Sequence, residues 1–82
     1  MSQIDMQFAA GKIDRELGKI RATKPDEAAV RHNWTVADAK YKEHVANGRG
    51  DSANGAAILA YYVARQAYFR YAQERGFSLE VS

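Results

Sequence analysis

One proline and one glycine-rich stretch divide the chain into three segments of helical length. Pro25 is the only proline, and a proline disfavours helical geometry in the residue before it. The second break runs from Asn47 to Gly55 and is rich in residues that favour turns. We therefore expect three helices and a short extended tail, at about residues 2–22, 25–46, 53–75 and 77–82.

Apolar residues recur along the first two segments with the period of an α-helix. The first stripe is Met6, Ala10, Ile13, Leu17 and Ile20, and the second is Val30, Trp34, Ala37, Tyr41 and Val45. Residues on such a stripe face the core, so we expect the indole of Trp34 to be buried. Thr23 or Lys24 is expected to cap the second helix, with Pro25 as its first residue.

The third segment is apolar on two faces. At 100° per residue, its broad aromatic face carries Ile58, Tyr61, Tyr62, Arg65, Tyr68, Phe69 and Ala72. Its second face carries Ala57, Ala60, Ala64, Ala67 and Tyr71. A helix with two apolar faces contacts two neighbours, so this helix is expected at the centre of an all-α, antiparallel three-helix bundle. An open helical hairpin that pairs with a second copy of the chain, as a homodimer, is the alternative.

The first segment also carries small and apolar residues behind its stripe. Gly11 and Gly18 lie there, and each costs about 1 kcal/mol relative to alanine inside a helix. They either let the alanine face of the third helix approach closely or are tolerated at exposed positions. Ile4 and Phe8 make the first turns of this helix apolar on nearly all sides, so a partner or the tail should cover them.

The tail alternates apolar and polar residues, which is the pattern of a strand with one buried face. The rest of the chain offers no second strand. We expect Phe77, Leu79 and Val81 to fold back over Ile4 and Phe8. Pairing with the tail of a second copy, or with the sheet edge of a partner, are the alternatives.

The composition indicates a protein of a reducing compartment. The chain has 82 residues, a net charge of +2 and no cysteine, which excludes disulfides and thiolate metal sites. No apolar run approaches the roughly 20 residues of a membrane span, and acidic residues interrupt the first segment where a signal peptide would be apolar. We expect a cytoplasmic protein with no membrane partner.

No pattern for catalysis, cofactor binding or metal binding is present in the sequence. His32 and His44 are the only histidines, and their spacing fits no common pair of metal ligands. The glycine-rich stretch lacks the flanking strand and lysine of a phosphate-binding loop. Residues 48–52 read Gly-Arg-Gly-Asp-Ser, which resembles the integrin-binding sequence of extracellular matrix proteins, but we interpret them as a turn-rich loop.

These observations favour a non-enzymatic protein that acts by binding another protein, as an adaptor or inhibitor of a larger protein or complex. Small accessory proteins of phages and mobile elements are of this kind, which is an association only. Tyrosine and arginine are enriched in binding hot spots. The predicted partner-binding residues are Tyr61, Tyr62, Arg65, Tyr68, Ile4 and Phe8. The competing interpretation of Arg65 is structural, with an acid of the first or second helix as its ion-pair partner.

A basic stripe on the first segment supports a second interpretation. Lys12, Arg15 and Lys19 share one side of the predicted helix and could contact phosphates in a nucleic-acid-binding regulator or assembly factor. The third segment begins with alanines and an isoleucine, unlike a DNA-recognition helix. Nucleic acid is therefore the less favoured partner, and a solvated charged face is the simpler explanation of the stripe.

Overall fold

The computed structural model describes residues 3–47 and 52–79, with side chains described for 9–47 and 55–79. These residues form three helices and no strand: α1 (Gln3–Thr23), α2 (Glu27–Asn47) and α3 (Ser52–Arg75). The predicted all-α, three-helix fold is confirmed. The Gly-Arg-Gly-Asp part of the loop, at residues 48–51, lies outside the described residues.

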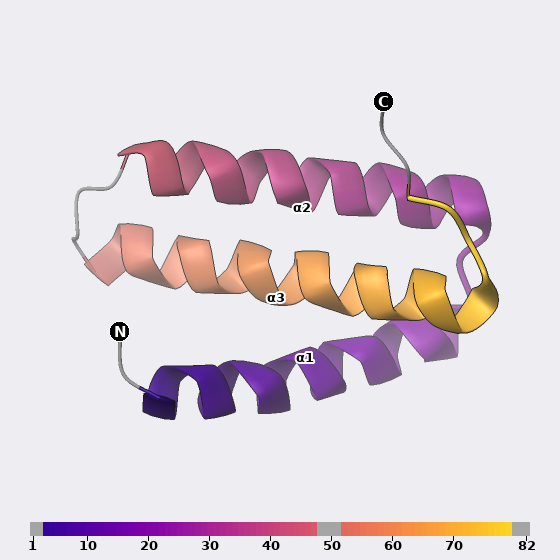
Figure 1. Ribbon diagram of the computed structural model, residues 1–82, viewed down its shortest axis with the longest axis horizontal. Helices are drawn as coiled ribbons and strands as arrows, with labels where there is room; N and C mark the ends of the chain where they lie inside the picture. The colour runs from indigo at the N-terminus through magenta and orange to yellow at the C-terminus, as the bar shows by residue number, and fades with distance from the viewer. Residues whose placement is uncertain (1–2, 48–51, 80–82) are drawn as a thin grey trace.

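The three helices lie side by side, with α3 in the middle (Figure 1). Among the described residues, α3 packs against both α1 and α2, whereas no Cα atom of α1 comes within 8 Å of one in α2. The Cα extents of the molecule are 36 × 27 × 17 Å. The central position predicted for the third helix is confirmed, and this arrangement leaves grooves on either side of α3.

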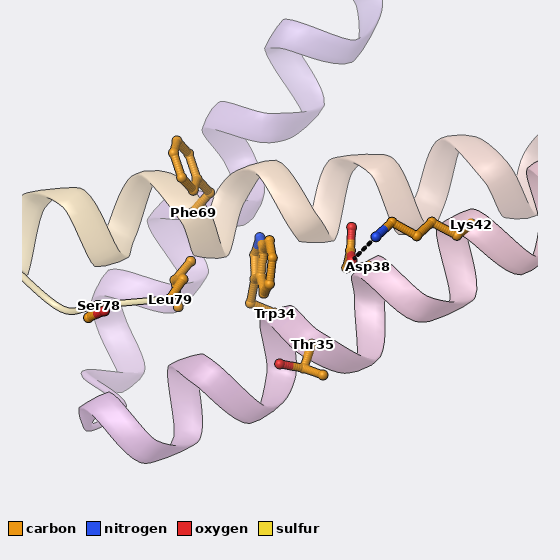
Figure 2. A pocket seen from close by; sticks show the side chains of 7 residues that line it. All are labelled: Trp34, Thr35, Asp38, Lys42, Phe69, Ser78 and Leu79. Atoms are coloured by element: carbon orange, nitrogen blue, oxygen red, sulfur yellow. Dashed lines mark ion pairs between the residues drawn. The ribbon is translucent and has the colours of Figure 1, made fainter. Parts of the chain in front are cut away.

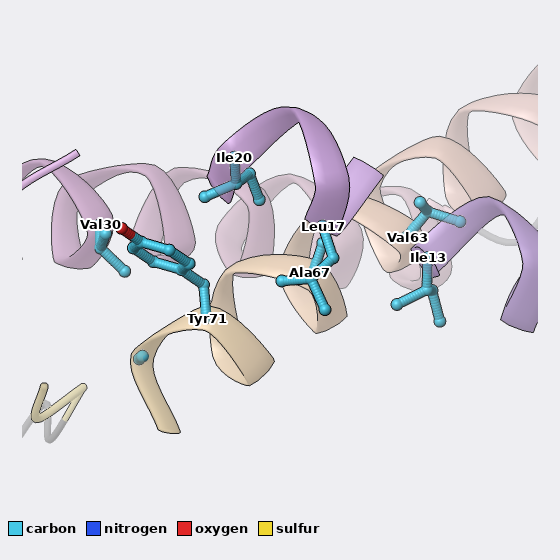
Figure 3. Close-up of a cluster of buried hydrophobic side chains, with 8 residues drawn as sticks. Ile13, Leu17, Ile20, Val30, Val63, Ala67 and Tyr71 are labelled. Carbon is cyan, nitrogen blue, oxygen red and sulfur yellow. The ribbon is translucent and has the colours of Figure 1, made fainter. Parts of the chain in front are cut away.

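The core lies mainly between α1 and α3 (Figure 3). From α1 come Ile13, Leu17 and Ile20, which are at most 5% exposed. They pack with Val63, Ala67, Tyr71 and Ala72 of α3 and with Val30 of α2. Val30 is completely buried and lies in the first turn of α2, about one turn from the α1–α2 connection. The connection therefore holds all three helices together at one end of the molecule.

Four residues of the predicted stripes, Ala10, Trp34, Tyr41 and Val45, are not among the buried core residues. Ala10 is exposed and its neighbour Ala9 is buried in its place. Val45 is 47% exposed, and Trp34 is only half-buried. Because α2 packs against α3 alone, the margins of its stripe stay open to solvent.

The two glycines of α1 do not serve a close helix contact. A Cβ atom built at Gly11 or at Gly18 would meet nothing within 4 Å. The explanation by packing against the alanine face is therefore wrong. The apolar stripe of α1 meets that face instead, where Ala67 is completely buried.

The connection between α1 and α2 is formed by Lys24, Pro25 and Asp26. Lys24 adopts a left-handed conformation (φ 50°), and its amide donates to the carbonyl of Ile20 at 3.0 Å, which ends α1. The N-cap of α2 is Asp26, whose Oδ1 accepts from the amide of Ala29 at 2.8 Å. The prediction of Thr23 or Lys24 as cap, with Pro25 inside the helix, is wrong because α2 begins at Glu27 and the Asp26 side chain caps it.

The end of α3 has the geometry of a Schellman motif. Gly76 is left-handed (φ 74°), and its amide donates to the carbonyl of Gln73 at 3.3 Å. The amide of Phe77 donates to the carbonyl of Ala72 at 2.8 Å. The ring of Phe77 then packs edge-on against Tyr71, with 6.2 Å between ring centroids.

The tail continues from this cap onto α2, and the prediction that it covers Ile4 and Phe8 is wrong. The amide of Ser78 donates to Oε2 of Glu27 at 3.0 Å, and its carbonyl accepts from Nε of Arg31 at 3.2 Å. The start of α1 lies at the opposite end of the molecule (Figure 1). The Schellman turn directs the chain toward α2, which supplies polar partners for its backbone. Val81 lies outside the described residues.

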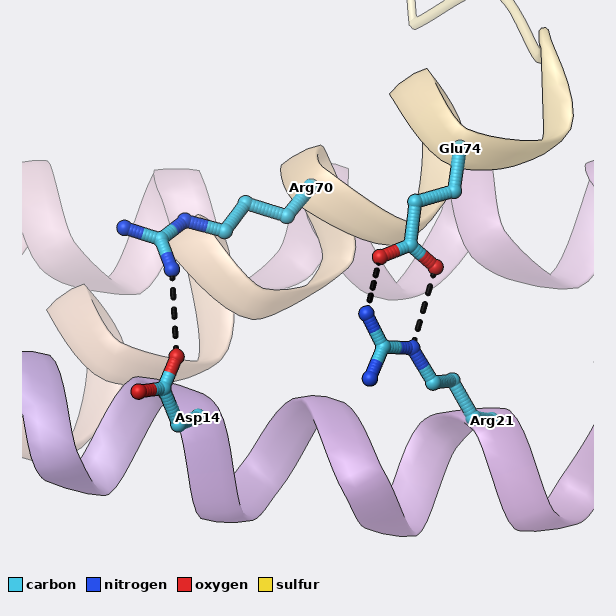
Figure 4. Close-up of polar contacts among 4 residues, drawn as sticks. All are labelled: Asp14, Arg21, Arg70 and Glu74. Atoms are coloured by element: carbon cyan, nitrogen blue, oxygen red, sulfur yellow. Dashed lines mark hydrogen bonds and ion pairs between the residues drawn. The ribbon is translucent and has the colours of Figure 1, made fainter.

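Two ion pairs join the exposed edges of α1 and α3 (Figure 4). Arg70 Nη1 lies 3.3 Å from Oδ1 of Asp14, and the guanidinium of Arg21 forms a two-point contact with the carboxylate of Glu74. Hydrogen bonding from Arg21 lowers the pKa of Glu74 below its ordinary value. All four side chains are substantially exposed, so the pairs fix the register of the helices more than they stabilise the fold.

Candidate functional site

Arg65 lies at the α2–α3 interface, where its guanidinium contacts residues of its own chain. Its Nη1 donates to Oδ1 of Asp38 at 2.8 Å, and its Cζ lies 4.3 Å from the centroid of the Tyr41 ring. The side chains of Arg65 and Asp38 are 22% and 15% exposed. Asp38 is therefore the acid of a neighbouring helix that the structural interpretation of Arg65 requires. A role of Arg65 in binding a partner stays a prediction.

Asp38 is the polar centre of this interface. Its second oxygen, Oδ2, lies 3.0 Å from Nζ of Lys42. Partial burial acts to raise the pKa of Asp38. Hydrogen bonds from Arg65 and Lys42, together with their positive charges, outweigh the burial and hold the pKa below its ordinary value. Asp38 is therefore a charged anchor that joins α2 to α3.

The predicted tyrosines of α3 contact residues of α2 or the core. The ring of Tyr62 is 5.9 Å from that of Tyr41, and Tyr61 stacks on His44 at 5.4 Å, so both contact α2. Tyr68 packs against the core, where burial and the negative charge of Glu16 in α1 raise the pKa of its hydroxyl. Tyr61 and Tyr68 stand seven residues apart on one side of α3, and a role of the three tyrosines in binding a partner stays a prediction. The side chains of Ile4 and Phe8 lie outside the described residues.

An open groove lies between α2, α3 and the tail (Figure 2). We name it the aromatic groove, and it is lined by Trp34, Thr35, Asp38, Lys42, Phe69, Ser78 and Leu79. Its volume is about 550 Å³. Trp34 and Leu79 are half-buried, and Phe69 is 41% exposed. Two aromatic rings therefore remain accessible in one concave surface.

The tail completes this groove. Hydrogen bonds to Glu27 and Arg31 hold the backbone of Ser78 against α2, and this places Leu79 beside Trp34 (Figure 2). The opposite end of the groove carries the Asp38–Lys42 ion pair. The surface thus has an apolar centre with charged groups at one end.

Sequence reasoning missed the aromatic groove because it assigned Trp34 to the core and the tail to α1. One available signal was the pair of polar neighbours of Trp34 on α2, since Thr35 and Asp38 line the same surface. Phe69 stands at the margin of the aromatic face of α3, which also indicates a position at the edge of the helix contact. The docking of the tail has no comparable signal in the sequence.

The basic stripe of α1 lines a second groove. Lys12, Arg15 and Lys19 all belong to it, together with residues from the first half of α3. Their predicted position on one side of a helix agrees with this placement. No group of three or more histidine or acidic side chains among the described residues could hold a metal ion. None of the described helices is both long and apolar enough to cross a membrane.

Comparisons of the chain with protein-family models, with curated proteins and with solved structures find no match.

Proposed function

We propose that this chain is a non-enzymatic binding protein that holds an apolar segment of another protein in the aromatic groove, as an adaptor or inhibitor. The observation that carries the proposal is the exposure of Phe69 beside the half-buried Trp34 in an open groove. Tryptophan in a partly enclosed pocket is a frequent centre of binding energy. The absence of cysteine suits work in a reducing cytoplasm.

The chemistry of the groove favours a protein partner. Burial of its apolar surface by a partner would contribute about 25 cal/mol of binding free energy for each Å² removed from water. Thr35 and Lys42 offer hydrogen bonds at the edge of the groove. An open groove of this kind accommodates a chain that continues beyond it at both ends. Apolar anchoring of this type is also only weakly dependent on salt, in contrast to phosphate contacts.

The test is capture of a partner by the immobilised protein from its native host, with two matched variants. Phe69→Ser removes an aromatic ring that lines the groove and is 41% exposed. Val45→Ser removes a side chain that is 47% exposed and lies outside the groove. Both variants should fold, because neither side chain is in the core. We expect Phe69→Ser to lose the partner and Val45→Ser to retain it. Equal capture by the two variants would contradict the proposal.

The nucleic-acid alternative depends on Lys12, Arg15 and Lys19, which line the other groove. A duplex bound there would dissociate steeply as salt is raised, because counterions are released from the phosphates on binding. Reversing the charges of these three residues would then abolish activity in a protein that still folds. The aromatic groove would be irrelevant to such binding.

A further inference from the structure

The second groove lies between α1 and the first half of α3, and we name it the basic groove. Its wall on α1 includes Lys12, Arg15 and Lys19, and its floor on α3 includes Leu59, Ala60 and Val63. Its volume is about 470 Å³. The axes of α1 and α3 diverge toward their N-terminal ends (Figure 1). The groove lies between residues 12–19 of α1 and residues 56–63 of α3. It shares no lining residue with the aromatic groove.

The wall of the basic groove carries a surplus of positive charge. The lining residues include three bases and one acid, Glu16, so the surplus is two charges. Glu16 lies 3.9 Å from Nζ of Lys19, whose side chain is still 70% exposed. Arg15 is exposed and forms no ion pair with the other described residues. The other nearby acid of α1, Asp14, faces Arg70.

The floor of the groove is apolar and small. Ala60 is exposed, Leu59 is half-buried and Val63 is 7% exposed. Because helix axes can approach more closely where the contacting side chains are small, another helix could lie over Ala60. A floor of this kind gives no advantage in binding a phosphate backbone, which needs donors and positive charge alone.

We propose that the basic groove binds a short amphipathic helix of a partner protein, with its apolar residues on the floor and its acidic residues against Arg15 and Lys19. Helix-in-groove recognition uses apolar anchors at i, i+3 or i+4 and i+7. Lys12 and Lys19 are seven residues apart, or about 10 Å along α1, so the partner contributes about two helical turns. Because the two grooves are separate, the inference does not depend on the function proposed for the aromatic groove.

The probe for this proposal is a displayed library of random peptides of about 16 residues, which is enough for four helical turns. The library is selected on the full chain. We expect enriched peptides with apolar residues at helical spacing and with aspartate or glutamate beside them. Arg15→Glu should weaken their binding by about tenfold or more. The matched charge reversal Lys40→Glu, at an exposed lysine of α2 outside both grooves, should leave it unchanged.

A second variant tests the floor. Ala60→Gln adds a polar side chain at an exposed position without changing the charge, so it should weaken peptide binding and leave phosphate binding unchanged. Enriched peptides that ignore Arg15→Glu or Ala60→Gln would overturn the proposal. Duplex DNA that binds in place of peptides and ignores Ala60→Gln would assign the groove to nucleic acid. A concentration-dependent dimer that Ala60→Gln dissociates would assign it to a second copy of the chain.

Discussion

Replacement of Gly18 by alanine should stabilise the protein. Gly18 lies inside α1, is exposed, and has open space where a Cβ atom would be. Glycine in the interior of a helix costs about 0.8–1.0 kcal/mol relative to alanine, and no contact is lost to offset the gain. We expect the free energy of unfolding to rise by about 1 kcal/mol, and the melting temperature by about 4–8 °C for a domain of this size.

The assay is chemical and thermal unfolding followed by far-ultraviolet circular dichroism, with Gly76→Ala as the control. Gly76 is also exposed with open space around it, but its φ of 74° disfavours a side chain. Gly76→Ala should therefore destabilise by about 1 kcal/mol. If Gly18→Ala lowered stability instead, the glycine would be packed against something, and the arrangement of α1 described above would be wrong.

Three further predictions concern the α2–α3 interface and the tail. Trp34→Ala should lower the free energy of unfolding by roughly half of the 3–5 kcal/mol typical of a fully buried ring, since the indole is half-exposed. Denaturant unfolding measures this loss, and a loss of the full size would show that the ring is buried. The folded pKa of Asp38 lies below its ordinary value of 3.8. The ionised carboxylate therefore stabilises the fold fully above pH 3.8, and this contribution is lost as the pH falls through the folded pKa. Asp38→Asn should therefore flatten the stability profile below about pH 4, and an unchanged profile would refute the role of the Arg65 pair. A chain ending at Gly76 should be less stable, because the core loses its contacts with Phe77 and Leu79, and a truncated chain with the same melting temperature would contradict the docking of the tail.

The parts of the fold that depend on local chemistry could be predicted from the sequence. Pro25 and Gly76 specify helix ends through backbone geometry alone, and the structure has a left-handed residue immediately before the first and at the second. The spacing of Ile13, Leu17 and Ile20 placed one side of α1 in the core, as the structure shows. Each of these features is set by neighbours in the chain.

The parts that depend on how the helices are arranged could not be predicted. The apolar stripes do not reveal that α2 packs against α3 and not against α1, and with this packing Trp34 is half-exposed and Val45 is open to solvent. The choice of Asp26 over Thr23 as cap depends on where the chain turns. The sequence predicts that an acidic residue pairs with Arg65. That this residue is Asp38 follows only from the register of α2 on α3.

The central claim, that the aromatic groove receives a protein partner, is tested most directly by nuclear magnetic resonance. The isotopically labelled protein is titrated with the partner recovered by capture, and changes in the backbone amide signals are mapped onto the structure. The account predicts that the largest changes occur at Thr35, Phe69 and Ser78, which line the groove. Largest changes around Tyr61 and His44, or along α1, with the groove residues unaffected, would contradict it.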